Sequence, residues 1–283
     1  MTIVVDNTMP DIQAGSDVRG IPIDQVGITE LKYPIVVLDQ QDGRQEVTAR
    51  LTMSVGLPHH FRGTHMSRFI EVLNDHRGEM TLRTFPSILQ DLRRRLDAEN
   101  AQLTVEFTYF LERAAPITGS TALMDYECRF QGESNGSGDD FVVGVDVPVA
   151  SLCPCSKAIS DYGAHNQRGH IEILVRSRKS ADGPPEIIWI EELIALAEES
   201  ASSRVYPLLK RSDERHVTME AYDNPAFVED IVRSVASRLM GDARVMWFQV
   251  HVVNLESIHN HNAFARIQWA REARESTSSG QHE

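Results

Sequence analysis

The stretch from Ser151 to Gly169 concentrates the side chains of this chain that are best suited to chemistry. It contains Cys153 and Cys155, separated by one proline, and His165 near its far end. Apolar, strand-like runs flank it on both sides, and a plain turn between two strands would need only a few Gly, Pro, Asn or Asp residues. The surplus of nucleophiles and ligands predicts that this connection carries the functional site.

A thiolate from Cys153 and an imidazole from His165 would supply two ligands of a metal site. Structural zinc sites usually use paired C-x-x-C motifs, whereas this chain has one C-P-C motif and no second pair. A catalytic metal site takes a third protein ligand and leaves one position for water. Candidates for the third ligand are Glu199, Glu214, Glu220 and Glu229. The alternative interpretation is a pair of small buried cysteines at a strand end, with the glutamates on solvated helix faces.

A second group of candidates, His259 and His261, forms an H-x-H unit near the C-terminus. Such a pair binds a metal, moves protons or, when protonated, contacts phosphate. Two exposed loop histidines are the alternative interpretation. An anionic substrate would also need cations, and the nearest ones in the sequence are Lys157, Arg168, Lys210 and Arg211.

The composition limits the classes of partner. The 283 residues are 41% hydrophobic and 24% charged, as in ordinary globular proteins, and the formal net charge is -13. This charge argues against nucleic acid and against an anionic membrane surface, because both are bound by clustered Lys and Arg. Three cysteines are too few for a disulfide framework, and neither a signal peptide nor an apolar run of about 20 residues is evident. We therefore expect a cytoplasmic protein.

Hydrophobic periodicity predicts an α+β fold, because alternating apolar residues indicate strands and apolar residues three and four apart indicate helices. Strands are expected over 33–38, 45–55, 102–114, 121–131, 141–150, 170–178, 244–254 and 262–270. Helices are expected over about 67–78, 85–98 and 190–197, and from Asn224 and Pro225 onward. Residues 132–140 have the composition of a flexible hairpin tip. Strands and helix pairs recur in both halves, which predicts antiparallel sheets with paired helices on one face, duplicated within the chain.

Several motifs closely resemble those of the prokaryotic type IB GTP cyclohydrolases. The central motif, LCPCSKAISDYGAHNQR, occupies residues 152–168. Shorter segments that belong to the same pattern lie at 60–69, 198–202, 205–211, 224–230 and 257–265. The resemblance covers roughly residues 20 to 270 and identifies the chain as a member of this family.

The resemblance implies a tunnelling fold and a homo-oligomer, a tetramer with active sites at subunit interfaces. On this basis we expect four segments: an N-terminal arm over 1–30, a first tunnelling-fold unit over 31–150, a second unit with the Cys/His motif over 151–270, and a flexible tail over 271–283. The implied activity is that of GTP cyclohydrolase I, a hydrolase. It would hydrolyse GTP at C8, release formate and form 7,8-dihydroneopterin triphosphate, the first step of tetrahydrofolate synthesis.

The resemblance also implies one divalent metal per site, either zinc, manganese or iron. Such a metal lowers the pKa of a bound water, and a mixed set of hard and soft ligands tolerates several metals. By resemblance, the ligands are Cys153, His165 and Glu214. Cys155 could exchange roles with Cys153, and Glu220 with either Glu214 or Glu229.

Substrate contacts follow from the same resemblance. Glu229 would anchor the guanine edge, because a carboxylate there accepts two N–H groups in a charge-assisted bidentate contact. His259 and His261 would transfer protons or contact the phosphates. The remaining candidates for substrate binding are Lys157, Arg168 and Glu220.

Two rival functions stay open at this point. The first is a nitrile reductase of the same fold, with a cysteine as covalent nucleophile and NADPH as cofactor. The chain has no G-x-G-x-x-G fingerprint, although some NADPH sites lack one. The second is a purine- or metal-binding protein without catalysis, which would bind GTP without turning it over.

Overall fold

The structure is a computed structural model that describes residues 11–13, 15–81, 83–136, 138–179 and 186–272. The strands are β1 (Ile23–Asp39), β2 (Gly43–Leu57), β3 (Ala101–Ala114), β4 (Thr121–Asn135), β5 (Gly138–Leu152), β6 (Asn166–Ser177), β7 (Ser203–Arg204), β8 (Val245–Leu255) and β9 (Ala263–Ala270). The helices are α1 (Met66–Asp75), α2 (Phe85–Leu96), α3 (Pro154–Ile159), α4 (Ile190–Glu198), α5 (Arg211–Asp223) and α6 (Val228–Gly241). The predicted α+β class is confirmed.

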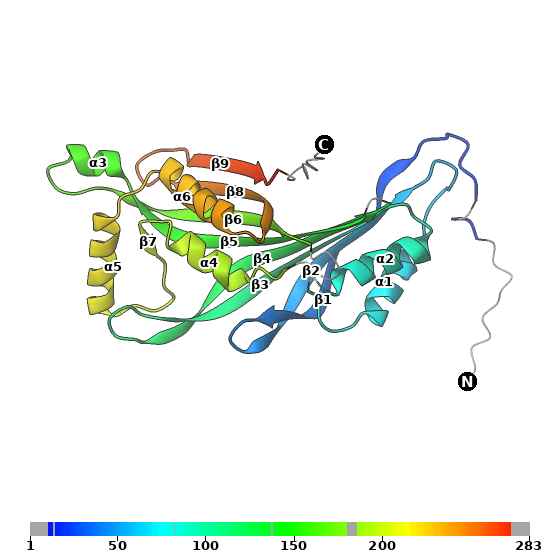
Figure 1. Cartoon of the computed structure of the whole chain (residues 1–283), viewed down its shortest axis with the longest axis horizontal. Coiled ribbons are helices and arrows are strands. Elements are labelled where there is room, and N and C mark those ends of the chain that lie inside the picture. Colours follow the sequence, from blue (N-terminus) through cyan, green and yellow to red (C-terminus); the bar gives the residue numbers. More distant parts are fainter. Residues whose placement is uncertain (1–10, 14, 82, 137, 180–185, 273–283) are drawn as a thin grey trace, which may run out of the picture. The chain divides into compact units, whose positions relative to one another are not determined.

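Two compact units make up the chain (Figure 1). The first comprises the described residues of 1–113, 123–145 and 180–191, and the second those of 114–122, 146–179 and 192–283. Within the first unit, the strand order is β1-β2-β3-β4-β5. Within the second unit, the order is β5-β6-β8-β9, and β7 pairs with β5. Strand β5 thus contributes residues 138–145 to the first unit and residues 146–152 to the second.

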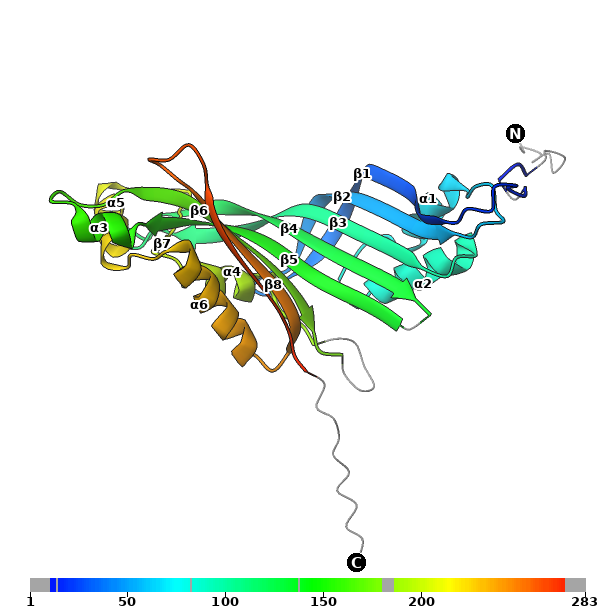
Figure 2. The same cartoon turned by 90° about the horizontal axis from the view of Figure 1, so that it is seen from above.

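One face of the first sheet is buried because the apolar residues of β2 alternate with polar ones. The side chains of Ala49, Leu51 and Met53 are buried, whereas those of Arg50 and Thr52 are exposed. Helices α1 and α2 lie side by side and present their apolar stripes to the core (Figures 1 and 2). The buried residues of these helices are Phe69, Val72, Leu73, Phe85, Ile88, Leu89, Leu92 and Leu96. Each such burial contributes about 1.5–3 kcal/mol to folding.

A buried polar group also belongs to the first unit. The Tyr109 hydroxyl lies 2.7 Å from Asp39 Oδ2 and 2.7 Å from Glu191 Oε1. Burial and the two carboxylates raise the pKa of Tyr109, so the phenol stays protonated and acts as the donor. This contact fixes Glu191, in the first turn of α4, to the end of β1, and both residues belong to the first unit.

In the second unit, α6 packs against β8 and β9 through one apolar face (Figure 2). Its buried residues are Val228, Ile231, Val232, Val235, Ala236 and Leu239. Strands β6 and β8 pair antiparallel, with Ile171 opposite Val252 and Ile173 opposite Val250. The sheet therefore carries a second core under its own helices.

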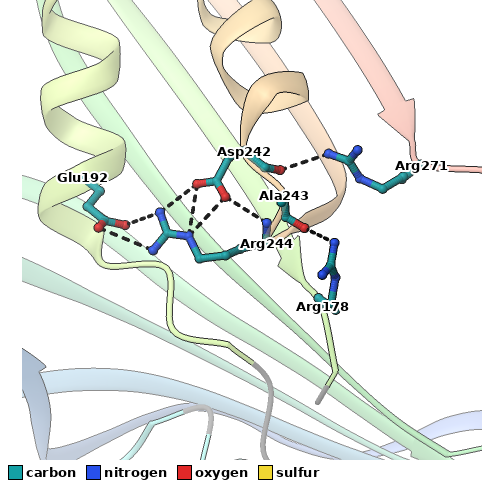
Figure 3. A network of polar contacts seen from close by, with 6 residues as sticks. All are labelled: Arg178, Glu192, Asp242, Ala243, Arg244 and Arg271. Carbon is teal, nitrogen blue, oxygen red and sulfur yellow. Dashed lines mark hydrogen bonds and ion pairs between the residues drawn. The ribbon is translucent and has the colours of Figure 1, made fainter. Parts of the chain in front are cut away.

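A polar network joins the ends of several elements of this second unit (Figure 3). The Arg244 guanidinium contacts Asp242 Oδ2 at 2.7 Å and Glu192 Oε2 at 2.9 Å, while Arg271 Nη2 donates to the Asp242 carbonyl at 2.9 Å. Hydrogen bonds from Arg244 hold the pKa of Asp242 below its ordinary value. The network ties α4, the α6–β8 turn and the end of β9 together.

The structure departs from the sequence predictions at several places. Residues 23–30, expected in an N-terminal arm, belong to β1. Of the expected hairpin tip, 132–135 belong to β4 and 138–140 to β5. Helix α6 begins at Val228 with Phe227 as its N-cap residue, so the prediction of a cap at Asn224 was wrong. The Gly183–Pro185 break and most of the predicted tail lie outside the described residues, and so do residues 1–10 of the arm.

Helices α3 and α5 were not predicted. Helix α3 has six residues and none of them is buried, and in α5 only Asp213 and Ala221 are buried. Neither helix therefore has the apolar stripe by which periodicity identifies a helix. Among the described residues, no helix is long and apolar enough to cross a membrane.

Candidate active site

A cavity of about 300 Å³ lies within the second unit, next to the end of β5. Its wall contains four of the residues singled out as catalytic from the sequence, together with the proposed guanine anchor. The lining residues are Cys153, His165, Gln167, Ala226, Phe227, Val228, Glu229, Asn254, Glu256, His259, His261 and Ala263. Side chains from four separate segments of the chain thus meet in one place.

Cys153 stands where β5 ends and α3 begins. Its sulfur accepts a hydrogen bond from the Ser156 N–H at 3.4 Å, so the thiol acts as the N-cap of the short helix, and Pro154 occupies the first helical position. The Cys153 N–H donates to the His165 carbonyl at 3.1 Å. This backbone contact closes the motif loop and brings the two predicted ligands into the same wall.

The imidazole of His165 is held from one side. Its Nδ1 lies 3.2 Å from Ser257 Oγ, and its backbone N–H donates to Ser156 Oγ at 3.2 Å. This arrangement leaves Nε2 for a metal or a proton. A histidine whose other ring nitrogen is fixed in this way has the usual form of a metal ligand.

Glu229 reaches the cavity from the first turn of α6. The helix start is capped by Asp230, whose Oδ2 accepts a hydrogen bond from the Phe227 N–H at 3.1 Å. The Ala226 N–H donates to the Leu152 carbonyl at 3.1 Å. The segment before α6 is therefore attached to the strand end that carries Cys153.

A buried polar chain strengthens this attachment. Asn254 Nδ2 donates to Ser151 Oγ at 3.2 Å, and the Ser151 hydroxyl donates to the Ala226 carbonyl at 3.1 Å. Both Ser151 and Asn254 are almost fully buried. Asn254 also lies against Gly169, because a Cβ added to that glycine would come within 2.9 Å of Asn254 Oδ1. The chain couples β8, β5 and the start of α6 around the cavity.

His259 and His261 enter the wall from the connection between β8 and β9. Their rings are stacked, with centroids 5.2 Å apart and planes inclined by 18°, and both side chains are exposed. Glu256, at the start of the same connection, is a further lining residue. The predicted H-x-H pair therefore lines the same cavity as Cys153 and His165 rather than lying on an unrelated loop.

Three of the other candidates lie away from this cavity. Glu214 is exposed on the first turn of α5. Lys157 donates through Nζ to the Tyr222 carbonyl, and its ammonium lies 4.2 Å from the centroid of the Tyr222 ring. Arg168 is exposed on β6, on the opposite face from its buried neighbour Gln167. None of the three lines the cavity within one chain.

Glu220 and Glu199 line a different cavity of about 510 Å³ in the same unit. Glu220 Oε2 accepts a hydrogen bond from Ser203 Oγ at 3.4 Å. Glu199 pairs with Arg238 at 2.5 Å. The structure thus separates these two glutamates from Glu229, the one that reaches the Cys153 cavity.

Helix α5, which carries Glu214, is fixed by the neighbouring Asp213. The Asp213 carboxylate accepts hydrogen bonds from the N–H groups of Ile117 and Thr118, from the Thr118 hydroxyl and from the Lys210 N–H, all at 2.8–2.9 Å. Burial alone would raise the pKa of Asp213, but these four hydrogen bonds outweigh it and lower the pKa below its ordinary value. These four hydrogen bonds therefore anchor the first turn of α5 within the second unit.

Sequence reasoning missed Gln167, Asn254 and Glu256. Gln167 could have been found, because residues two apart on an extended chain share a face and Gln167 follows His165 by two positions. Asn254 and Glu256 enter through the pairing of β6 with β8, which places Asn254 opposite Gly169. No local sequence pattern predicts the register in which β6 pairs with β8.

Two of the lining residues carry donor atoms that suit a divalent metal. Cys153 Sγ and His165 Nε2 are donors of the kind that zinc and related metals take, and both line the cavity. Within the part of the chain that the structure describes, no three His, Cys, Asp or Glu side chains gather closely enough to hold a metal. The residues fit as a partial ligand set that needs at least one further donor.

Comparison with solved structures supports the fold. The chain superposes on uricase from Arthrobacter globiformis with a TM-score of 0.50 and 9% identity, covering 89% of this chain and 95% of that one. A highly active mutant of urate oxidase from Bacillus sp. TB-90 gives a TM-score of 0.51 at 7% identity, over 88% and 100% of the two chains. At these identities the likeness concerns the fold alone, and it confirms the predicted tunnelling fold.

The sequence defines the class more closely. Residues 9–265 match the family described as type I GTP cyclohydrolase folE2, and the chain belongs to this family. It is 52% identical to the GTP cyclohydrolase FolE2 of Syntrophus aciditrophicus over 260 residues, which are 92% of this chain and 99% of that protein. The GTP cyclohydrolase FolE2 of Geobacter metallireducens is 51% identical over 261 residues, 92% and 97% of the two chains. The family expected from the motif at 152–168 is therefore confirmed.

Proposed function

We propose that this protein hydrolyses GTP at C8, releases formate and closes the product to 7,8-dihydroneopterin triphosphate, the entry to tetrahydrofolate synthesis. The observation that carries the proposal is the cavity in which Cys153, His165 and Glu229 meet, in a chain of the FolE2 family. We further propose the cytoplasm as its compartment. A count of three cysteines, too low for a disulfide framework, agrees with a reducing environment.

Cys153 and His165 would hold a divalent metal, which we propose to be zinc, manganese or iron. When bound there, it would lower the pKa of a water molecule and make hydroxide available for attack at C8. The chain itself orients the two donors. The Ser156 N–H fixes the sulfur, and Ser257 fixes the imidazole so that Nε2 is the ligand nitrogen.

Glu229 would select guanine among the purines. Its carboxylate lines the cavity and accepts hydrogen bonds only, so it suits the N1–H and 2-amino groups on one edge of guanine. Adenine offers an acceptor in place of the N1–H and would leave the carboxylate without a partner there. His259 and His261, which line the same cavity, would move protons.

The remaining predicted residues enter the proposal through a second copy of the chain. Glu214 is exposed on α5 and the described cavity offers only a partial ligand set, so a metal ligand or substrate contact from another subunit would complete the site. We therefore retain a homotetramer with interface sites, with Glu214 as third ligand. Lys157, Arg168 and Glu220 are retained as candidate contacts to the substrate in that assembly.

The proposal is tested by removing metal from the purified protein, adding back manganese or zinc, and following GTP conversion by pterin fluorescence after oxidation. We expect fluorescent product that depends on the metal. GTP that is bound by the folded protein but not converted with any divalent metal would contradict the proposal and favour a binding protein.

Cys155→Ala provides the matched control for Cys153→Ala in this assay. Cys155 belongs to the same motif, but it is exposed and does not line the cavity. We expect Cys153→Ala to lose the product and Cys155→Ala to keep it. Equal loss in both variants would show that the motif needs both cysteines and would contradict the assignment of the ligand role to Cys153 alone.

A further inference from the structure

Gln167 is a buried polar residue of the cavity wall that the proposed chemistry does not use. It is 9% exposed, lies on β6 and lines the cavity with Cys153, His165 and Glu229. Its side-chain oxygen, Oε1, is shielded from solvent and has no hydrogen-bond partner among the described residues. A buried carbonyl oxygen without a partner costs about 1–3 kcal/mol. Such an atom beside a cavity points to a donor that arrives with a ligand.

Glu256 determines which end of the carboxamide faces that ligand. Gln167 Nε2 donates to Glu256 Oε1 at 3.4 Å. The opposite orientation would bring the amide oxygen against a carboxylate, and neither group could donate. Glu256 therefore turns the NH₂ group toward itself and leaves Oε1 as an acceptor next to the cavity.

The position of Gln167 indicates which donor it would meet. It follows His165 by two residues on an extended chain, so the two side chains share a face about 7 Å apart. In the proposed reaction, His165 marks the place where C8 is attacked, and Glu229 accepts the guanine N–H edge. On the C8 side of GTP the purine presents N7, which is an acceptor, while the ribose on the adjacent N9 presents hydroxyl donors.

We propose that Gln167 Oε1 accepts a hydrogen bond from a ribose hydroxyl of the nucleotide and thereby orients the sugar beside C8. Gln167 is thus a ribose-recognition residue, and Glu256 is the positioning residue that sets its orientation. This inference rests on the proposed function, because it takes the bound ligand to be GTP.

The test compares nucleotide affinities by calorimetry in the Cys153→Ala background, where turnover is expected to stop. GTP, 2′-deoxy-GTP and 3′-deoxy-GTP are titrated into protein with Gln167 or with Gln167→Met, which keeps the length and removes the acceptor. We expect one deoxy analogue to bind about 10-fold more weakly than GTP to the Gln167 protein, as for the loss of one hydrogen bond. Gln167→Met should bind GTP and that analogue equally weakly.

If the methionine variant folds poorly, the comparison of GTP with the two deoxy analogues on the Gln167 protein is sufficient to test the inference. Equal binding of GTP and both deoxy analogues to the Gln167 protein would overturn the inference. So would a Gln167→Met variant that weakens GTP and both analogues by the same factor, because that pattern indicates a structural role. Gln249→Met is the matched control, since Gln249 is half-buried on β8 and does not line the cavity.

Failure of the inference is distinguishable from failure of the proposed function. If GTP is converted to formate and pterin but the deoxy analogues bind as well as GTP, the ribose contact alone is wrong. If no GTP binds to the folded protein, both are wrong.

Discussion

Each of the two units has a cavity of similar size, about 270 Å³ in the first and 300 Å³ in the second, but their walls differ in chemistry. The first cavity lies at the start of β1 and the end of β2. Its lining includes one histidine, His59, two carboxylates, Asp24 and Glu99, and no cysteine. The second collects a thiol, three imidazoles and two carboxylates.

The difference lies in the connections and not in the scaffold. Both units build an antiparallel sheet covered by helices, but only the second has a strand end followed at once by Cys153 and a loop that returns to the same strand end at His165. Functional residues commonly lie in the loops that connect the strands and helices of a scaffold. We therefore expect changes in the second cavity to affect the reaction and changes in the first unit to affect stability.

The largest expected effect is that of Cys153→Ala. Loss of the sulfur removes one of the two proposed metal donors of the cavity, so GTP conversion should fall at least about 100-fold. The melting temperature should change little, because Cys153 is only half-buried. Rates of formate release and thermal unfolding, measured side by side, check both statements. A Cys153→Ala variant that remains active would contradict the assignment of Cys153 as a metal ligand.

Glu229→Gln should weaken GTP binding about 10- to 100-fold, because a neutral amide replaces the carboxylate proposed to accept two N–H groups of guanine. Calorimetric titration measures this change, and Asp223→Asn, which alters an exposed carboxylate at the end of α5, is the control. We expect ATP to bind weakly to the wild type, and if it binds equally weakly to Glu229→Gln while only GTP loses affinity, Glu229 is the guanine selector. Unchanged GTP affinity would contradict that role.

Asp213→Asn should lower the melting temperature by about 5 °C at pH 7, since an amide cannot accept all four hydrogen bonds as strongly. The pKa of Asp213 is lowered in the folded state, so its stabilising contribution is present above the ordinary value of 3.8 and is lost as the pH falls below it. Melting temperatures between pH 7 and pH 3 should therefore decline more steeply for the wild type than for Asp213→Asn. Parallel curves would contradict this account.

The corresponding change in the first unit is Tyr109→Phe. It leaves Asp39 and Glu191 without the shared hydroxyl and should destabilise the fold by about 1–3 kcal/mol. Denaturant titration measures the loss, and Tyr33→Phe is the control because the Tyr33 hydroxyl makes only a 3.5 Å contact with the Leu73 carbonyl. GTP conversion per folded molecule should stay unchanged in both variants. A specific loss of activity in Tyr109→Phe would contradict the expectation that changes in the first unit affect stability and not the reaction.

The fold could be predicted wherever side-chain periodicity coincides with burial. The alternation over 45–55 and the stripe of Phe69, Val72 and Leu73 follow directly from which face is buried. Helix α5 could not be predicted from periodicity, because its start is held by hydrogen bonds to Asp213 and not by an apolar stripe. The hydrogen bonds from Ile117 and Thr118 to Asp213 join residues 96 and 95 positions apart, and local patterns do not reveal them.

The site divides in the same way. Cys153 and His165 share one loop, so their meeting could be expected from the sequence, and the structure places both in one wall. The lining by Asn254 and Glu256 depends on the register of β8 against β6, which composition does not determine. Glu214 stays a prediction from family resemblance, because one chain alone does not bring it to the cavity.

The most direct test of the central claim follows the C8 carbon. GTP labelled at C8 is incubated with the manganese-loaded protein, and labelled formate and pterin are quantified in the wild type, Cys153→Ala and Cys155→Ala. The account predicts one labelled formate for each pterin in the wild type and in Cys155→Ala, and neither product in Cys153→Ala. Labelled formate from Cys153→Ala at the wild-type rate would contradict the assignment of the reaction to this cavity.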